Sequence, residues 1–291
     1  MEWVTCIKET IRFIEEHLTE KFTIDDVAKH VALSSLYLQR GFQIITGFSL
    51  GEYIRNRRLY EAGKEILATD DKMIDISYKY GYETPESFSK AFLRFHGYSP
   101  LACRKKHKDL HTFHRIQIEI NVKGGNDMDF KFEELDTFKV IGLSRDISFE
   151  ASYTDIPSFW NEFCQSISSG SKEMLKEAIL NHCIGELGIC FGEIGNTKTF
   201  KYMIGGFYDK GPVPKDLEVV EIPKNLWVKF KSVGAMPNAI QELNTRIFKE
   251  WLPGNKDYEI AAEYNIEWYS RDKNMNSSEY ISEIWLPIKR K

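Results

Sequence analysis

The first hundred residues of the chain contain two copies of one short pattern, fifty residues apart. Phe42-x4-Gly47-Phe48-Ser49 recurs as Phe92-x4-Gly97-Tyr98-Ser99, whereas the upstream match of Val27-Ala28 with Ile76-Ser77 has a spacing of forty-nine. The second copy therefore has one extra residue in its turn, near 81–85. Two copies are too few for a solenoid. Two short helices joined by a tight turn, duplicated about a connecting helix, predict paired helix-turn-helix units.

The flanking residues of this region also follow helical spacing. Apolar side chains recur at steps of three and four from Trp3 to Leu18, as on one face of an amphipathic helix. Thr23, followed by two acids, is placed to cap a second helix, and Ser34 or Ser35 is placed to cap a third. The spacing then predicts a longer connecting helix through 53–67.

After residue 108 the periodicity changes to that of strands. Isoleucine and valine alternate with polar residues over 116–122, and 124–127 is typical of a turn or flexible link. Further strand-like segments lie at about 129–134, 138–146, 186–194, 199–208, 217–222, 226–233, 260–270 and 280–288. Helices are predicted after Pro157 and Pro237, with each proline at the first helical position. The second domain is therefore predicted to be α+β, in two halves with one helix each.

Length and composition restrict the class of protein. At about 150 residues per domain, 291 residues suggest two domains. The chain is 42% hydrophobic and 28% charged, which disfavours disordered and fibrous classes. Five scattered cysteines without a Cys-x-x-Cys pair argue against a disulfide framework or a zinc ribbon. No apolar run approaches the length of a membrane span, and the first helix is too charged for a signal peptide, which predicts a cytoplasmic protein.

The charge distribution contains one local excess of positive charge. The chain carries a formal charge of −4, yet residues 87–108 contain six basic side chains and no acidic one. This segment is a candidate for a surface that faces phosphates, although a solvated helix end would give the same pattern.

A recognition helix needs a face whose side chains reach base edges. In the third helix we expect Leu33, Leu38 and Phe42 to be buried, which leaves Ser35, Leu36, Gln39 and Arg40 outward. Glutamine suits adenine and arginine suits guanine through paired hydrogen bonds. In the second copy the outward face is Pro85, Glu86, Ser89 and Lys90. The full set predicted to contact DNA is Ser34, Ser35, Leu36, Gln39, Arg40, Thr84, Pro85, Glu86, Ser89, Lys90, Arg94 and Lys105.

Residues 8–107 resemble the DNA-binding domain of the AraC/XylS family of transcriptional regulators. The matching residues are Ile24-x2-Val27-Ala28-x5-Ser34-x3-Leu38-x-Arg40-x-Phe42-x4-Gly47, Tyr53-Ile54-x3-Arg58-Leu59-x2-Ala62 and Ile74-x-Ile76-x4-Gly81-Tyr82-x5-Phe88-x3-Phe92-x4-Gly97-Tyr98-Ser99-Pro100-x3-Arg104. The resemblance implies two recognition helices in successive major-groove segments of double-stranded DNA. The sequence departs from the family pattern at Ser77 and at Pro85-Glu86, which leaves the base preference of the second half open.

The second domain has few residues that suggest catalysis. It has no Gly-rich phosphate loop, no His-Glu-x-x-His and no nucleophile elbow, so we expect no catalytic residues, metal site or cofactor. Its most distinctive segment is 260–269, where Glu267 stands among aromatic residues and shares a strand face with Asn265 and Tyr269. A lone carboxylate among rings suits a pocket for a lipophilic cation. A solvated sheet face is the alternative that the pattern leaves open.

Residues 129–288 resemble a GyrI-like effector-binding domain. The matching elements are Val140-Ile141-Gly142-Leu143, Ile156-Pro157-x2-Trp160-x2-Phe163, Tyr202-x2-Gly205, Ile222-Pro223, Trp251-Leu252-Pro253, Ile266-Glu267-x-Tyr269 and Leu286-Pro287-Ile288. The resemblance implies duplicated β-α-β-β halves around a cleft, with an acid at its floor. By this similarity the ligand-binding residues are Glu267, Tyr269, Trp160 and Tyr202, with Phe191 and Trp268 as weaker candidates. The order of the two domains resembles that of the Rob regulator.

Together these features predict an all-α domain with two helix-turn-helix units over 1–108, a linker over 109–128 with a possible added strand, and an α+β effector-binding domain over 129–291. The first hypothesis is a transcriptional regulator, most simply an activator that contacts RNA polymerase, whose cleft binds a small amphipathic effector, with a cation as one candidate. The second is a DNA-binding regulator whose C-terminal domain docks a protein partner. The third, more remote, is a hydrolase of reactive small molecules that uses Glu267 and Tyr269.

Overall fold

The computed structural model describes residues 3–106, 109–118, 128–169, 173–192, 198–271 and 274–291. The chain divides into two compact units. One unit comprises Trp3–Leu33 and Thr46–Asn121, and the other comprises Ser34–Ile45 together with Val122–Lys291. Among the described residues, no helix is both long and apolar enough to cross a bilayer.

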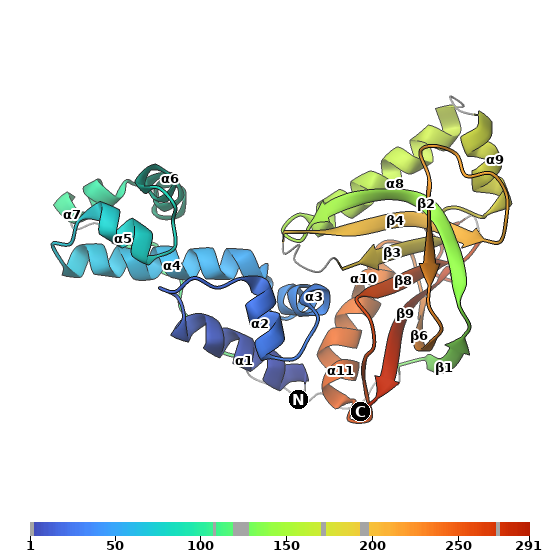
Figure 1. The fold of residues 1–291 in the computed structure, drawn as a ribbon, viewed down its shortest axis with the longest axis horizontal. Coiled ribbons are helices and arrows are strands. Elements are labelled where there is room, and N and C mark those ends of the chain that lie inside the picture. Colours follow the sequence, from blue (N-terminus) through green and yellow to red (C-terminus); the bar gives the residue numbers. More distant parts are fainter. Residues whose placement is uncertain (1–2, 107–108, 119–127, 170–172, 193–197, 272–273) are drawn as a thin grey trace. The chain divides into compact units, whose positions relative to one another are not determined.

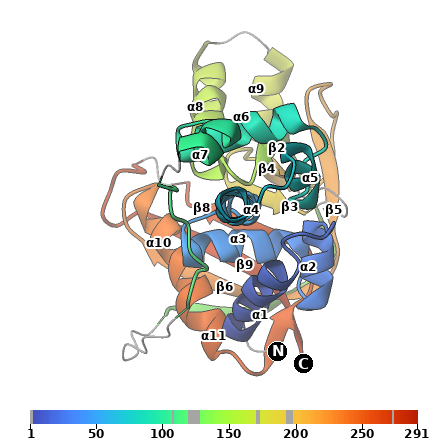
Figure 2. The same ribbon diagram turned by 90° about the vertical axis from the view of Figure 1, so that its left-hand side faces the viewer.

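The first unit is helical. Its helices are α1 (Trp3–Glu16), α2 (Ile24–His30), α4 (Leu50–Ala68), α5 (Met73–Lys79), α6 (Pro85–His96) and α7 (Pro100–Lys106). The long helix α4 connects two groups: α5, α6 and α7 surround one of its ends, and α1 and α2 lie at the other (Figure 1). Figure 2 shows α4 end-on. The aromatic rings of Phe88 and Phe92 on α6 are buried in the core that these helices share.

The repeat in the sequence corresponds to a repeated order of helices, as predicted. Helix α3 (Ser35–Thr46) ends before Gly47, and α6 ends before Gly97; both glycines have φ near +80°, a conformation that costs other residues energy. Ser49 then caps α4 by accepting from the Glu52 amide, and Ser99 accepts from the amide of Ala102 in α7. The Gly-aromatic-Ser pattern is therefore a helix stop followed by a helix start. The loop before α6 is one residue longer than the loop before α3, also as predicted.

The predicted helix caps are confirmed at both positions. Thr23 and Asp26 form a reciprocal capping box at α2, in which each side chain accepts from the other residue's backbone N–H. Of the two serines considered for α3, Ser34 is the one that caps, because its hydroxyl accepts from the amide of Tyr37 at 3.3 Å. Each such cap contributes about 1 kcal/mol.

A buried ion pair fixes α1 against α4. The guanidinium of Arg57 donates to both carboxylate oxygens of Glu15, at 2.8 and 2.7 Å, and Tyr53 donates to the same carboxylate at 2.8 Å. Arg57 also donates to the backbone carbonyl of Phe113. Because every partner is satisfied, this charge is stable inside the helical core.

The second unit contains a large antiparallel sheet. Its strands are β1 (Phe130–Leu135), β2 (Phe138–Ser148), β3 (Leu187–Phe191), β4 (Thr199–Tyr208), β5 (Glu218–Ile222), β6 (Asn225–Val233), β7 (Tyr258–Ile260), β8 (Tyr264–Tyr269) and β9 (Ile281–Arg290). The helical elements are α3, α8 (Ser152–Ser169), α9 (Glu173–Asn181), α10 (Asn238–Arg246), the π-helical turn η1 (Ile247–Trp251) and α11 (Leu252–Gly254). The strand order is β1-β6-β9-β8-β3-β4-β2-β5, with β7 paired to β9.

This order shows the predicted duplication. One half is β2-α8-β3-β4 and the other is β6-α10-β8-β9, and they meet where β3 pairs with β8. The strands that precede the halves are exchanged: β1 precedes the first half but pairs with β6, and β5 precedes the second half but pairs with β2. Each half therefore supplies an edge strand to the other.

The sheet is strongly curved, as the long strand β2 shows in Figure 1. Phe138 on β2 and Trp227 on β6 lie far apart in the strand order, yet their ring centroids are 6.3 Å apart. Trp227 is completely buried, with Ile189 and Ile266 in the same cluster. The concave face thus forms its own core, and the opposite face packs against α8.

Several details of the second unit differ from the sequence-based expectation. Helix α8 begins at Ser152, so Pro157 lies inside it, and Pro237 is the N-cap of α10 rather than its first residue. Helix α9 and strand β7 were not predicted. Of the expected 116–122 strand, 116–118 have no regular structure; 119–122 and the turn at 124–127 lie outside the described residues.

A substitution at Gly97 tests whether the repeated glycine is needed to end the helix. Its φ of +81° disfavours residues with a Cβ, although a Cβ there would meet no atom within 4 Å. We expect Gly97→Ala to lower the free energy of unfolding of the helical unit by about 1 kcal/mol, purely through backbone strain. Urea denaturation followed by circular dichroism at 222 nm measures it. Gly97→Asn is the matched control and should cost less, since asparagine tolerates this conformation; equal losses would contradict the argument.

Candidate functional site

Glu267 on β8 is the centre of a hydrogen-bond network on the helix-covered face of the sheet. Its Oε2 accepts from the hydroxyls of Tyr202 on β4 and Tyr269 on β8, both at 2.9 Å. Trp160 on α8 donates its Nε1–H to the Tyr202 oxygen, also at 2.9 Å. Four residues predicted for ligand binding are therefore joined in one chain of hydrogen bonds, contributed by one helix and two strands.

Space for this network is provided by Gly188. It lies opposite Glu267 in the β3–β8 register, and a Cβ on it would overlap the Tyr202 hydroxyl and approach the Glu267 carboxylate to 3.0 Å. Only glycine leaves both groups in place. Sequence reasoning did not identify Gly188, because its importance depends on a register between strands distant in the sequence.

The network is buried and keeps its hydroxyls protonated. Burial raises the pKa of Tyr202 and of Tyr269 well above the usual value for tyrosine, and the neighbouring charge of Glu267 raises both further. Both phenols therefore remain hydrogen-bond donors to the carboxylate at neutral pH. The Glu267 side chain is 12% exposed.

A cavity of about 480 Å³ opens above Glu267 and Tyr269. Its walls are α8, with Tyr153, Ile156 and Trp160 among the lining residues, and α10, with Ile240 and Asn244; Arg40, Gln43 and Ile44 of α3 complete it. We call this cavity the cleft. A largely apolar enclosure of this size with one carboxylate on its floor is typical of a small-molecule site.

Helix α3 belongs to the same unit and packs into the cleft through Arg40. The guanidinium donates to Asn265 Oδ1 at 2.5 Å and to Cys190 Sγ at 3.2 Å, and its Nη2 lies 3.9 Å from Glu267 Oε1. Burial disfavours the charged form, but Cys190 and Glu267 outweigh it and raise the pKa of Arg40. Burial also disfavours the charged form of Cys190, and for a thiol this raises the pKa, to about 12.

The predicted exposure of the first recognition face is not what the structure shows. Ser35, Leu36 and Gln39 are buried and Arg40 is 14% exposed, although all four were expected to point outward. The physical reason is that Leu36 joins the apolar cluster beneath α8 and Arg40 reaches the cleft floor. The hydrophobic spacing alone could not reveal a second surface that covers this face.

The second recognition face is exposed as expected. On α6, Glu86, Ser89, Lys90 and Arg94 are exposed, while Phe88 is buried. Thr84 accepts from the Ser87 amide as the N-cap, so its side chain also serves the helix start. Pro85 is the first residue of α6 and is half-buried; Lys105 on α7 is exposed.

The two weaker ligand candidates lie on the other face of the sheet. Phe191 and Trp268 pack against the core of the concave face, opposite to the cleft. Strand alternation explains both positions, because Trp268 follows Glu267 and Phe191 follows Cys190. Asn265 and Cys190, which the prediction omitted, are paired across β3 and β8 and face Arg40. The two-residue spacing of Asn265 and Glu267 was the available signal for the first of them.

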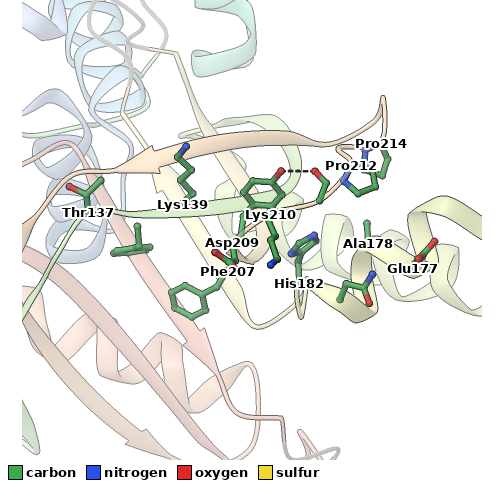
Figure 3. A pocket seen from close by; sticks show the side chains of 14 residues that line it. Thr137, Lys139, Glu177, Ala178, His182, Phe207, Asp209, Lys210, Pro212 and Pro214 are labelled. Carbon is green, nitrogen blue, oxygen red and sulfur yellow. Dashed lines mark hydrogen bonds between the residues drawn. The ribbon is translucent and has the colours of Figure 1, made fainter.

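A second hollow, of about 760 Å³, lies at the far end of β4 (Figure 3). Lys139, Lys210, Asp209, Glu177 and His182 are among the side chains that line it. The Tyr208 hydroxyl donates to the carbonyl of Gly211 at its edge. Within the part of the chain that the structure describes, no cluster of His, Cys, Asp and Glu could hold a metal ion.

A helical domain with duplicated helix-turn-helix elements, joined to a duplicated α+β domain with a charged cleft, defines a class of DNA-binding regulators with effector-binding-type domains. Comparison with known proteins gives the family. The family described as "Cass2: Integron-associated effector binding protein" matches residues 131–288, and a helix-turn-helix domain family matches residues 27–106. The chain belongs to the Cass2, or GyrI-like, effector-binding family through its C-terminal domain and has an AraC-type N-terminal domain.

Three similar proteins illustrate the relationship. The HTH-type transcriptional activator AarP of Providencia stuartii is 44% identical over 100 residues, covering 34% of this chain and 74% of AarP. The right origin-binding protein of Escherichia coli K12 is 26% identical over 162 residues, covering 56% of this chain and 55% of that protein. A solved bacterial transcription regulation protein from Staphylococcus aureus MU50 is 22% identical with a TM-score of 0.44, covering 56% of this chain and 99% of that one. The two family matches and the similarity to AarP identify the chain as a DNA-binding transcriptional regulator of the AraC type with an effector-binding-like domain.

Removing the Tyr202 hydroxyl tests the network. Tyr202→Phe deprives Glu267 of a donor and Trp160 of its acceptor, so we expect the second unit to lose about 1–2 kcal/mol of stability. Guanidinium denaturation followed by tryptophan fluorescence measures the loss. Tyr208→Phe, on the same strand but with an exposed hydroxyl bond, is the control. A loss no larger than that of the control would show that the network contributes little.

Proposed function

We propose that this protein is an effector-responsive transcriptional activator. Its N-terminal domain reads double-stranded DNA, and its cleft binds a small amphipathic cation through Glu267, Tyr269, Trp160 and Tyr202. The observation that carries the proposal is the position of Glu267, a nearly buried carboxylate at the floor of a cavity of about 480 Å³.

Electrostatics supports a cationic effector. Two hydroxyl donors hold the Glu267 carboxylate in place, and a carboxylate in a poorly solvated cleft attracts a cation more strongly than the same group does in water. Trp160 and Tyr269 lie with their ring centroids 5.1 Å apart beside the carboxylate, and the faces of such rings favour cations. Apolar residues such as Ile156 and Ile240 suit the hydrophobic part of the ligand. An inward-facing carboxylate argues against a surface used only to dock a protein.

The DNA-binding side of the proposal uses the two recognition helices. The exposed residues Glu86, Ser89 and Lys90 of α6 are the proposed base-reading face of the second helix-turn-helix. Arg94 and Lys105 are the proposed phosphate contacts. Ser34, Ser35, Leu36, Gln39 and Arg40 are the proposed contacts of α3. The similarity to AarP, which is named an activator, supports activation, and RNA polymerase is the partner that we propose for it.

A ligand screen on the full chain tests the cleft. We expect benzyltributylammonium, a lipophilic cation, to raise the melting temperature saturably, and expect deoxycholate and decyl maltoside to have smaller effects. The shift should be lost in Glu267→Gln, because the neutral amide no longer attracts the cation. Differential scanning fluorimetry measures the shift.

The control for this screen is Glu221→Gln, which removes an exposed carboxylate of β5. It should respond to the cation as the wild type does. A shift that persists in Glu267→Gln would place the ligand elsewhere, and the absence of a shift with every class would favour a protein partner for this domain.

The phosphate contacts predict a salt-dependent effect. Arg94→Ala should weaken binding similarly for all sequences and make the slope of log K against log salt shallower by about one. Fluorescence anisotropy with a duplex selected by the wild-type chain from a random pool measures both. Arg12→Ala removes an exposed cation from α1 and serves as the control. A loss confined to the selected sequence would instead make Arg94 a base contact.

A further inference from the structure

We infer that Arg40 is an internal competitor of the effector: α3, docked in the cleft, is withheld from DNA, and a cation that takes the place of the guanidinium releases it. The inference rests on the proposed effector site and adds its regulation and the chemistry of its ligand.

The docked guanidinium has a matched set of polar partners. Asn265 and Cys190, both buried, accept from Nη1, and Glu267 supplies the opposite charge at 3.9 Å from Nη2. These partners come from β3 and β8, the strands that join the two halves. A buried arginine is costly unless its charge and its N–H groups have partners, and these three residues supply an opposite charge and two acceptors.

Apolar and backbone contacts extend the docking beyond Arg40. Leu36 is 1% exposed within the cluster beneath α8, and the Tyr37 hydroxyl donates to the backbone carbonyl of Tyr264 at 2.8 Å. Gly192 permits this approach, because a Cβ on it would lie 3.0 Å from the Leu36 Cβ and 2.7 Å from Glu263 Oε2. Tyr37 is not among the residues proposed to touch bases, so docking also uses a side chain that DNA reading does not need.

Docking and DNA reading require the same side chains. Leu36, Gln39 and Arg40 cannot reach base edges in a major groove while they are buried in the second unit. The effector and Arg40 likewise compete for the Glu267 carboxylate. Because the effector binds the undocked state better, and DNA needs that state, the two ligands must favour each other's binding.

The position of Arg40 also specifies the chemistry of the effector. A ligand that replaces it gains charge pairing with Glu267, but only a ligand with N–H groups can also donate to Asn265. We therefore expect benzylguanidinium to bind more tightly than benzyltrimethylammonium, although the two have similar apolar parts.

Calorimetric titration of the full chain with benzylguanidinium tests the competition directly. Arg40→Ala vacates the subsite, so the cation should bind about tenfold more tightly than to the wild type, since no fraction of the protein is closed by α3. Arg40→Lys should give an intermediate affinity. Arg145→Ala, which removes an exposed arginine paired with Glu162, should leave the affinity unchanged. Equal or weaker binding to Arg40→Ala would overturn the inference.

DNA binding without any effector gives a second, independent test. Asn265→Ala removes an acceptor of Arg40, and Gly192→Ala obstructs Leu36; neither residue belongs to the proposed DNA contacts. Both variants should bind the selected duplex about tenfold more tightly than the wild type, approaching the affinity that the wild type reaches with saturating benzylguanidinium. Asn181→Ala, an exposed asparagine on α9, is the control. Two variants are used so that misfolding of one leaves the test decisive.

The outcomes separate this inference from the proposed function. If the cation gives a Glu267-dependent thermal shift but neither the cation nor the two docking variants change DNA affinity, the effector site stands and the competition is refuted. If no cation binds but both variants tighten DNA binding, the docked helix is inhibitory and its natural release needs another cause.

Discussion

The antiparallel pairing of β3 with β8 is the contact on which the second unit depends. It joins the two halves of the sheet, and its register places Gly188 opposite Glu267 and Cys190 opposite Asn265. The glycine leaves room for the Tyr202 hydroxyl, and the second pair supplies the acceptors for Arg40. A shift of one residue would turn Glu267 toward the concave core, where an unpaired charge is costly. The fold and the candidate site therefore share one constraint.

The two carboxylate oxygens of Glu267 have different partners. Tyr202 and Tyr269 donate to one oxygen of Glu267, while Arg40 lies near the other. The tyrosines lie on strands of the sheet, whereas the arginine comes from a helix with a second proposed role. In the proposed competition, a ligand therefore replaces Arg40 at Glu267 and leaves the two tyrosine hydrogen bonds intact.

Much of the fold could be predicted from the sequence because the relevant signals are local. The repeat of Gly47 and Gly97 with Ser49 and Ser99 marks helix ends, and strand alternation placed Glu267 and Tyr269 on one face. Trp160 and Tyr202 came from family resemblance rather than from periodicity. The remainder could not be predicted, since it depends on pairings between distant segments. The role of Gly188 depends on the register between β3 and β8. Leu36 is buried by a surface that lies more than a hundred residues away in the sequence.

The exchange of β1 and β5 between the halves has an evolutionary consequence. A simple tandem duplication would leave each copy with its own preceding strand, and either copy could later be lost without harming the other. Here β1 completes the sheet beside β6, and β5 completes it beside β2. Neither half can be inherited, fused or trimmed alone without exposing an unpaired strand edge in the remaining one. The two halves from Phe130 to Arg290 therefore depend on each other for their edge strands.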